Sequence, residues 1–153
     1  MGPVKGTGFR VLCLPLMANV NQKGVIGLVK VTADLVTRGF EVFTPISDAC
    51  PVDLIAANDA MTLRRIQVKY REPSARDHVL FVSLDSVVNG RRVPINLSLL
   101  DGWAIYCPQT EKVYYVRRDA VSLRSIRLCL QDSRQRRQGR LATDFMDPAS
   151  LWF

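Results

Sequence analysis

The chain lacks an apolar stretch long enough to cross a membrane. Its 153 residues are 48% hydrophobic and 23% charged, and no uninterrupted apolar run approaches the ~20 residues that a transmembrane helix needs. The short apolar run at 11–16 is interrupted by Pro15 and followed by no convincing small-residue cleavage site. We therefore expect a soluble, cytoplasmic protein without a cleaved signal peptide and without a membrane partner.

Cysteine and histidine are also scarce. The cysteines are widely separated and form no Cys-x-x-Cys motif; they are Cys13, Cys50, Cys107 and Cys129. With only His78 to join them, this spacing argues against a zinc site and against the dense disulfide framework of small secreted domains. Reduced thiols are the simpler expectation, and His78 is assigned no role because no serine or cysteine constellation accompanies it.

The length and charge fit one basic domain. A chain of this size can bury about two-thirds of its unfolded surface without disulfides. The formal net charge of +7 favours polyanionic partners such as nucleic acids, although charge alone does not select one. We divide the chain into an N-terminal extension at 1–19, a core at 20–130, and a basic C-terminal arm and tail at 131–153.

The first half of the core predicts a helix followed by a three-strand meander. Apolar residues recur at helical spacing between Val25 and Val36, which predicts an amphipathic helix over 22–38. Gly39 suits the left-handed position that commonly ends a helix. Asn58-Asp59 reads as a hairpin turn. The strands are expected at 40–43, 52–57 and 63–70.

The second half of the core predicts two further hairpins. Strands at 78–84 and 91–97 could pair around Asn89-Gly90. The other hairpin joins 103–107 to 112–116, and a short helix leading into a last strand is expected over 119–130.

The C-terminal region changes abruptly in composition. The polar, basic run at 131–140 has no apolar periodicity and reads as an exposed arm. Phe145, Trp152 and Phe153 give the last segment too much aromatic surface for a solvated tail. We expect that segment to dock on the body or on another subunit.

Asp53 opens one predicted strand, and Gln67-Val68-Lys69 lies inside the next. Side chains alternate along a strand, so Gln67 and Lys69 share a face opposite that of Ile66 and Val68. Carboxylate and amide oxygens can hold a hard cation such as magnesium, and a neighbouring lysine can orient an attacking water. This arrangement indicates a metal-dependent phosphodiesterase site on a hairpin.

Structural alternatives remain open for these residues. Asp53 could hydrogen-bond local backbone at a strand start, and Gln67, Lys69 and Arg65 could form the solvent face of an amphipathic strand. Arginines at predicted turns and in the tail are either solvated charge or phosphate contacts flanking a DNA duplex. They are Arg91, Arg92, Arg117, Arg118, Arg134, Arg136, Arg137 and Arg140.

Several segments together resemble successive sequence blocks of the PD-(D/E)XK nuclease family, and over about 20–130 the chain is most similar to its small group I intron homing endonucleases. These blocks are KGVIGL (23–28), GFEV (39–42), PVDL (51–54), IQVK (66–69), WAIYCP (103–108) and KVYYV (112–116). The combination is far more specific than any single block.

The resemblance implies a restriction-endonuclease-like α/β core, with a central mixed β-sheet flanked by helices. It implies magnesium dependence, with manganese as an alternative ion, double-stranded DNA as substrate, and assembly as a homo-dimer or tetramer. Asp53 would be the metal-binding aspartate, Gln67 would stand at the usually acidic position, and Lys69 would be the catalytic lysine. We add the Val68 backbone carbonyl as a further candidate metal ligand.

Two residues depart from the family pattern. The family usually carries a glutamate after the second glycine of its first-helix block, where this chain has Leu28. Leucine cannot bind metal or accept a proton, but on the apolar helix face it should leave folding intact. Gln67 adds no charge, so Asp53 is the only matched anionic ligand and weak metal binding is expected.

The leading hypothesis is a sequence-specific, homing-type DNA endonuclease. The alternative is a DNA-recognition protein whose nuclease site is cleavage-deficient because of Leu28. A third hypothesis is a basic RNA-binding module that stacks bases on Tyr106, Tyr114 and Tyr115.

Overall fold

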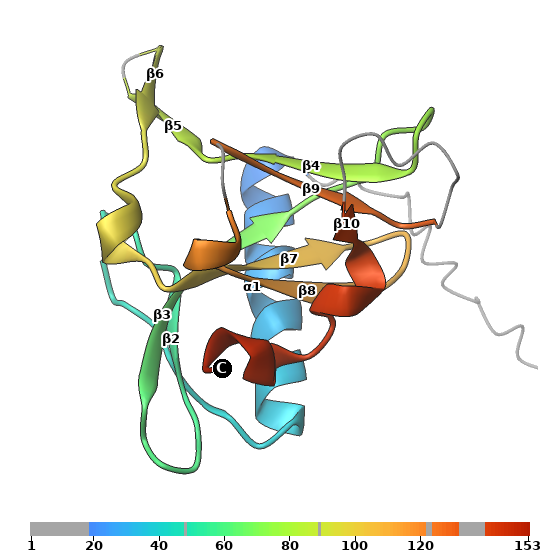
Figure 1. The fold of residues 1–153 in the computed structure, drawn as a ribbon. Helices are drawn as coiled ribbons and strands as arrows, with labels where there is room; N and C mark the ends of the chain where they lie inside the picture. Colours follow the sequence, from blue (N-terminus) through green and yellow to red (C-terminus); the bar gives the residue numbers. More distant parts are fainter. Residues whose placement is uncertain (1–18, 48, 89, 122–123, 132–139) are drawn as a thin grey trace, which may run out of the picture.

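The computed structural model describes residues 19–47, 49–88, 90–121, 124–131 and 140–153 (Figure 1). Its one α-helix in this described part, α1 (Val20–Thr37), begins at Asn19 with a capping box: the Asn19 side chain accepts from the Gln22 backbone, and the Gln22 side chain accepts in return. Gly39 follows the helix at φ +87°, the left-handed conformation expected there. The predicted helix is therefore confirmed.

A mixed sheet forms the centre of the molecule, with strand order β1-β2-β3-β7-β8. β3 and β7 pair in parallel and the other neighbours are antiparallel, which confirms both the meander and the predicted hairpin at 103–116. The loop between β2 and β3 spans 58–62, longer than the two-residue turn expected. The strands are β1 (Glu41–Phe43), β2 (Leu54–Ala57), β3 (Leu63–Tyr70), β7 (Gly102–Cys107) and β8 (Lys112–Arg117).

The expected pairing of 78–84 with 91–97 is wrong. β4 (Val79–Ser83) pairs instead with β9 (Ser125–Cys129), and β10 (Arg140–Leu141) adds a parallel edge to β9. A hairpin does form around Gly90, but its strands are β5 (Asp85–Val88) and β6 (Arg91–Pro94). The buried positions of β4 explain the difference, because Leu80 and Val82 pack into the core beside Ile126 and Leu128 of β9.

The region 119–130 is only partly as predicted. Its strand, β9, is present, but the described residues of the expected helix form only the 3-10 turn η2 (Arg118–Ala120), and residues 122 and 123 lie outside the described part. A second short 3-10 turn, η1 (Leu97–Leu99), precedes β7.

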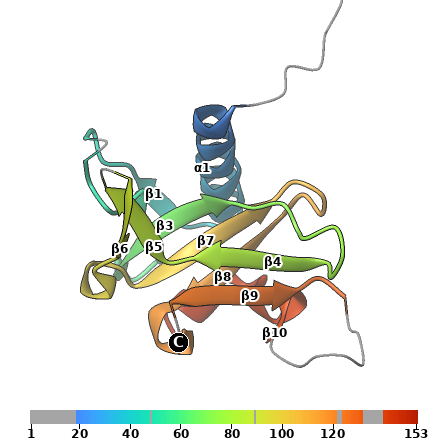
Figure 2. The ribbon, with the colours of Figure 1, turned by 90° about the horizontal axis from the view of Figure 1, so that it is seen from above.

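Figure 2 shows three layers, with α1 on one face of the central sheet and β4 and β9 on the other. The helix-side core contains Val31 and Leu35 of α1 together with Ile66 of β3. The core on the opposite side contains Leu80, Ile126 and Trp103. Since β7 is buried along its whole length between the layers, it forms the centre of the domain. None of the helices in the described ranges has the length and apolarity to span a membrane.

The C-terminal segment docks on the body, one of the two outcomes expected for it. It forms two 3-10 turns, η3 (Ala142–Phe145) and η4 (Pro148–Leu151), and Leu151 is buried in the helix-side core. Trp152 stacks on Phe40 with ring centroids 4.8 Å apart, and its Nε1 donates to the Thr62 carbonyl at 2.8 Å. The tail therefore packs against β8 and reaches Phe40 and the β2–β3 loop at the end of the sheet.

Gly102 lies where the tail packs against the sheet without room for a side chain. A Cβ at this position would lie 2.7 Å from both Leu151 Cδ2 and the Val116 carbonyl oxygen. Because the carbonyl belongs to the β7–β8 pair, it cannot move without disturbing the sheet. We expect Gly102→Ala to lower the free energy of unfolding by about 2 kcal/mol, a typical cost of overpacking, measured by urea denaturation.

Gly24 provides the matched control for this substitution. It lies in α1, and a Cβ there would meet no heavy atom within 4 Å. Gly24→Ala should therefore raise stability by roughly 0.5–1 kcal/mol, through helix propensity alone. Equal effects of the two substitutions would contradict the close packing of the tail on β7.

Candidate active site

The candidate site forms where β2 separates from β3. The two strands pair up to Leu54 and Ile66, and the Asp53 backbone N–H adds a final hydrogen bond to the Ile66 carbonyl at 3.0 Å. Beyond this point, Asp53 Oδ2 accepts from the Val68 backbone N–H at 2.7 Å. The aspartate side chain thus satisfies the N–H that β2 leaves without a strand partner. Asp53 thus bonds the neighbouring strand rather than the local backbone expected in the structural alternative, and this places its carboxylate beside the segment that holds Gln67 and Lys69.

Gln67 is buried, with 9% of its surface exposed. Its Oε1 accepts from Trp103 Nε1 at 3.2 Å, and its Nε2 donates to the Pro51 carbonyl at 3.5 Å. The alternative that Gln67 lies on a solvent face is therefore wrong. An amide oxygen has two lone pairs, so the bond from Trp103 leaves one for a further partner.

Asp53 and Lys69 perturb each other electrostatically. Burial raises the pKa of Asp53 above its ordinary value, although the Val68 N–H and the Lys69 charge oppose this shift. Burial also lowers the pKa of Lys69; the Asp53 charge opposes the shift, and the positive charge of Arg71 adds to it. A bound cation would therefore stabilise the ionised form of Asp53. The lysine beside it releases its proton more readily than a lysine in water does.

Arg65, on the same strand face as Gln67, has a different partner. Its guanidinium donates to both oxygens of Asp101, through Nε at 3.1 Å and Nη2 at 3.0 Å, and its backbone N–H donates to Asp101 Oδ2 at 2.8 Å. Partial burial raises the pKa of Asp101, but these bonds and the arginine charges outweigh it and leave the pKa below its usual range. Arg65 thus ties β3 to the start of β7.

Leu28 lies on the opposite side of the sheet from Gln67. It is half-buried and packs against the helix-side core, as its place on the apolar helix face predicted. Its neighbour Gly27 brings α1 close to β3, since a Cβ there would lie 3.3 Å from Tyr70 Cβ and 3.6 Å from Val68 Cγ1. The helix therefore crosses β3 at the segment that carries Lys69.

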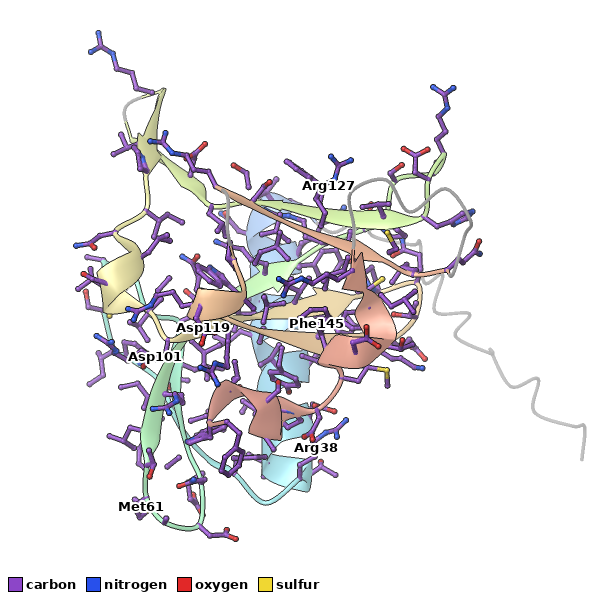
Figure 3. The ribbon with its side chains drawn as sticks, in the orientation of Figure 1. Arg38, Met61, Asp101, Asp119, Arg127 and Phe145 are labelled. Carbon is purple, nitrogen blue, oxygen red and sulfur yellow. The ribbon has the colours of Figure 1, made fainter. Side chains whose placement is uncertain are left out.

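The predicted arginines lie apart from Asp53 and Lys69 along the chain and take varied contacts. Arg117 pairs with Asp119, and Arg118 Nη1 donates to the Leu97 carbonyl at 3.4 Å. Arg117 and Arg118 line a pocket of about 220 Å³ with Arg64, Asp101 and Asp119, and the last two are labelled in Figure 3.

The other predicted arginines are less informative. Arg140 places its guanidinium 5.9 Å from the Phe145 ring centroid, and Arg91 is exposed on β6. Arg134, Arg136, Arg137 and the side chain of Arg92 lie outside the described residues.

The tyrosines proposed to stack RNA bases do not offer such a surface. Tyr106 is 4% exposed, Tyr114 3% and Tyr115 0%. Tyr115 donates its hydroxyl to Asp34 of α1 at 2.7 Å, a structural bond between the helix and the sheet. The stacking hypothesis is therefore wrong for these rings.

Sequence reasoning missed two residues of the site. Trp103 reaches Gln67 because β7 pairs in parallel with β3, a register that nothing local in the sequence specifies. Arg71 follows Lys69 by two residues, and strand alternation alone could have identified it as a neighbour.

The oxygen atoms at the site are of the types that coordinate a hard cation. Asp53 offers a carboxylate, Gln67 an amide oxygen, and Val68 a backbone carbonyl, all ligand types that magnesium accepts alongside water. They supply a single negative charge. Among the residues that the structure describes, no group of three or more histidine, cysteine or acidic side chains could hold a metal.

A family model described as PD-(D/E)XK endonuclease matches residues 18–146. The chain belongs to this endonuclease family. No curated protein matches it. The bacterial homing endonuclease I-Ssp6803I has a similar structure, with a TM-score of 0.73 and 21% identity over 88% of this chain and 93% of that one. The Holliday junction resolvase Hjc of Archaeoglobus fulgidus, an archaeal hyperthermophile, gives a TM-score of 0.45 and 16% identity over 69% and 82% of the two chains.

The comparison with the homing endonuclease shows a shared fold. It confirms the expected restriction-endonuclease-like α/β class with a central mixed sheet. The helices expected around that sheet are represented, in the described residues, by α1 alone and by short 3-10 turns.

Proposed function

We propose that this protein is a sequence-specific, homing-type endonuclease that hydrolyses double-stranded DNA with magnesium. The observation that carries the proposal is the Asp53–Val68 hydrogen bond of 2.7 Å, which brings the aspartate against the strand segment of Gln67 and Lys69. Membership of the PD-(D/E)XK endonuclease family supports the reaction class. The net charge of +7 favours a polyanionic substrate.

In this proposal, the residues divide the work of phosphodiester hydrolysis. Asp53, the Gln67 amide oxygen and the Val68 carbonyl would hold magnesium, which would lower the pKa of a bound water and neutralise charge on the phosphate. Lys69 donates hydrogen bonds to the attacking water and counters the negative charge that develops in the transition state. Trp103 fixes the Gln67 amide through the 3.2 Å bond to its oxygen.

Cutting both strands of a duplex needs two such sites. Each chain contains one Asp53–Lys69 pair, so we propose a homo-oligomer, either a dimer or a tetramer. The candidate DNA contacts in the arm, together with Arg91, Arg92, Arg117 and Arg118, would lie on the phosphate backbone and give a salt-dependent affinity.

A second function, DNA recognition without cleavage, is favoured by Leu28. This apolar residue stands on the helix that crosses β3 beside Lys69, where the family has a carboxylate. A binding-only protein would retain duplex DNA but leave it intact under all metal conditions.

A metal-dependence experiment tests the proposed hydrolysis. Long mixed-sequence duplex DNA is incubated with the protein in magnesium, calcium or EDTA, and both retention and cutting are scored. We expect cutting in magnesium, its loss in EDTA, and its loss in the Asp53→Asn variant, which keeps the size of the side chain but removes the only anionic ligand. Retention without cutting in magnesium would favour the binding-only function instead.

A further inference from the structure

Arg71, two residues beyond Lys69, adds a second positively charged side chain near the candidate site. The Arg71 backbone N–H donates to the Tyr106 carbonyl at 2.9 Å, which continues the pairing of β3 with β7 past the end of the strand. Alternation then puts Arg71 on the same face as Lys69. Both side chains are half-buried. Arg71 and Lys69 are therefore neighbouring cations, and Lys69 also interacts with the Asp53 carboxylate.

Arg71 has no acidic partner in the described part of the chain. Its Nη1 donates to the carbonyl of the preceding residue, Tyr70, at 2.8 Å. The ion pairs among the described residues join Lys23 to Glu72, Arg38 to Asp34, Arg65 to Asp101 and Arg117 to Asp119. Neither Lys69 nor Arg71 belongs to this set.

A half-buried guanidinium without a counter-ion is stabilised by a bound anion. Burial removes part of its hydration, and a single carbonyl satisfies only one of its five N–H donors. Arginine binds phosphate oxygens through paired donors whose geometry matches the phosphate. The anion that fits a strand face carrying a nuclease site is a phosphate of the nucleic-acid backbone.

We propose that Arg71 contacts a phosphate of duplex DNA beside the candidate active site, and that this contact needs no divalent cation. The inference rests on the proposed function because it takes duplex DNA as the ligand. Under this proposal Arg71 binds the DNA backbone in the ground state. Lys69 remains available for the chemical step.

Binding measurements in EDTA test this role. A mixed-sequence duplex oligonucleotide is titrated with wild type, Arg71→Gln and Arg71→Lys over a series of sodium chloride concentrations. We expect Arg71→Gln to bind about tenfold more weakly at low salt, with a slope of log affinity against log salt that is smaller by about 1. Arg71→Lys keeps the charge, so its slope should equal that of wild type.

Arg38→Gln is the matched control. It removes the same charge from the end of α1, on the other side of the sheet, where Arg38 pairs with Asp34. Its affinity and salt slope should stay close to those of wild type. An equal loss in Arg38→Gln and Arg71→Gln, or no loss in Arg71→Gln, would overturn the contact.

Thermal unfolding separates this role from a structural one. Because Arg71 has no acidic partner among the described residues, Arg71→Gln should unfold at the same temperature as wild type or higher. A large drop, or failure to fold, would assign Arg71 to stability and reject the inference. These binding measurements do not depend on cleavage. A protein that shows the Arg71 dependence but never cuts with magnesium would keep this inference and lose the proposed hydrolysis.

Discussion

The Lys69→Ala variant should cut duplex DNA at least about 100-fold more slowly than wild type, because it loses a preorganised cation at the reacting phosphate. Lys69 is half-buried, and its electrostatic neighbours are Asp53 and Arg71. Solvent cannot easily replace its charge there. Binding to the same duplex should change by less than about threefold, because we propose that Arg71 and the other arginines, rather than Lys69, hold the phosphates in the ground state. Single-turnover cleavage in magnesium and binding in calcium measure the two quantities.

Lys112 supplies the control for this variant. It is exposed at the start of β8, and Lys112→Ala removes the same side chain from the surface. Its cleavage rate should remain close to that of wild type. If Lys69→Ala cuts as fast as Lys112→Ala, Lys69 is not the catalytic lysine.

Leu28→Glu should strengthen metal-dependent cleavage. The substitution adds a carboxylate to α1 on the helix side of β3, beside Val68, so it would approach a bound cation from the side of the Val68 carbonyl rather than from that of Gln67. Asp53 is the one anionic residue among the candidate ligands named above. We expect the magnesium concentration for half-maximal cleavage to fall by about tenfold, the lower end of the usual effect of a residue that supports a metal site. Loss of a half-buried leucine should lower stability by about 1–2 kcal/mol, measured by urea denaturation.

Leu28→Gln separates charge from shape in this experiment. The glutamine side chain has nearly the same size as that of glutamate and is also polar, but it carries no charge. Cleavage by Leu28→Gln should resemble that of wild type at every magnesium concentration. Equal behaviour of the glutamate and glutamine variants would show that position 28 does not contribute to metal binding.

Local signals in the sequence predicted local structure well. The helical spacing of α1 and the left-handed Gly39 that follows it depend on neighbours in the chain. The alternation of β3 also placed Ile66 in the helix-side core and Gln67 on the opposite face. These features need no knowledge of distant segments.

Features that depend on distant segments were predicted less well. The pairing of β4 with β9 joins segments more than forty residues apart, and the nearer Asn89-Gly90 turn signal favoured a different partner. Parallel pairing of β3 with β7 brings Trp103 to Gln67, which no spacing in the sequence indicates. The burial of Tyr115 between sheet and helix likewise follows from tertiary packing.

The ends of cut DNA test the central claim most directly. Long mixed-sequence duplex DNA is incubated with wild-type protein and magnesium, and all new ends are sequenced. If the protein is a homing-type endonuclease, we expect double-strand ends at discrete, recurring sequences. These ends should be absent with EDTA and with Lys69→Ala. Intact DNA that the protein nevertheless retains, or ends scattered without sequence preference, would contradict it.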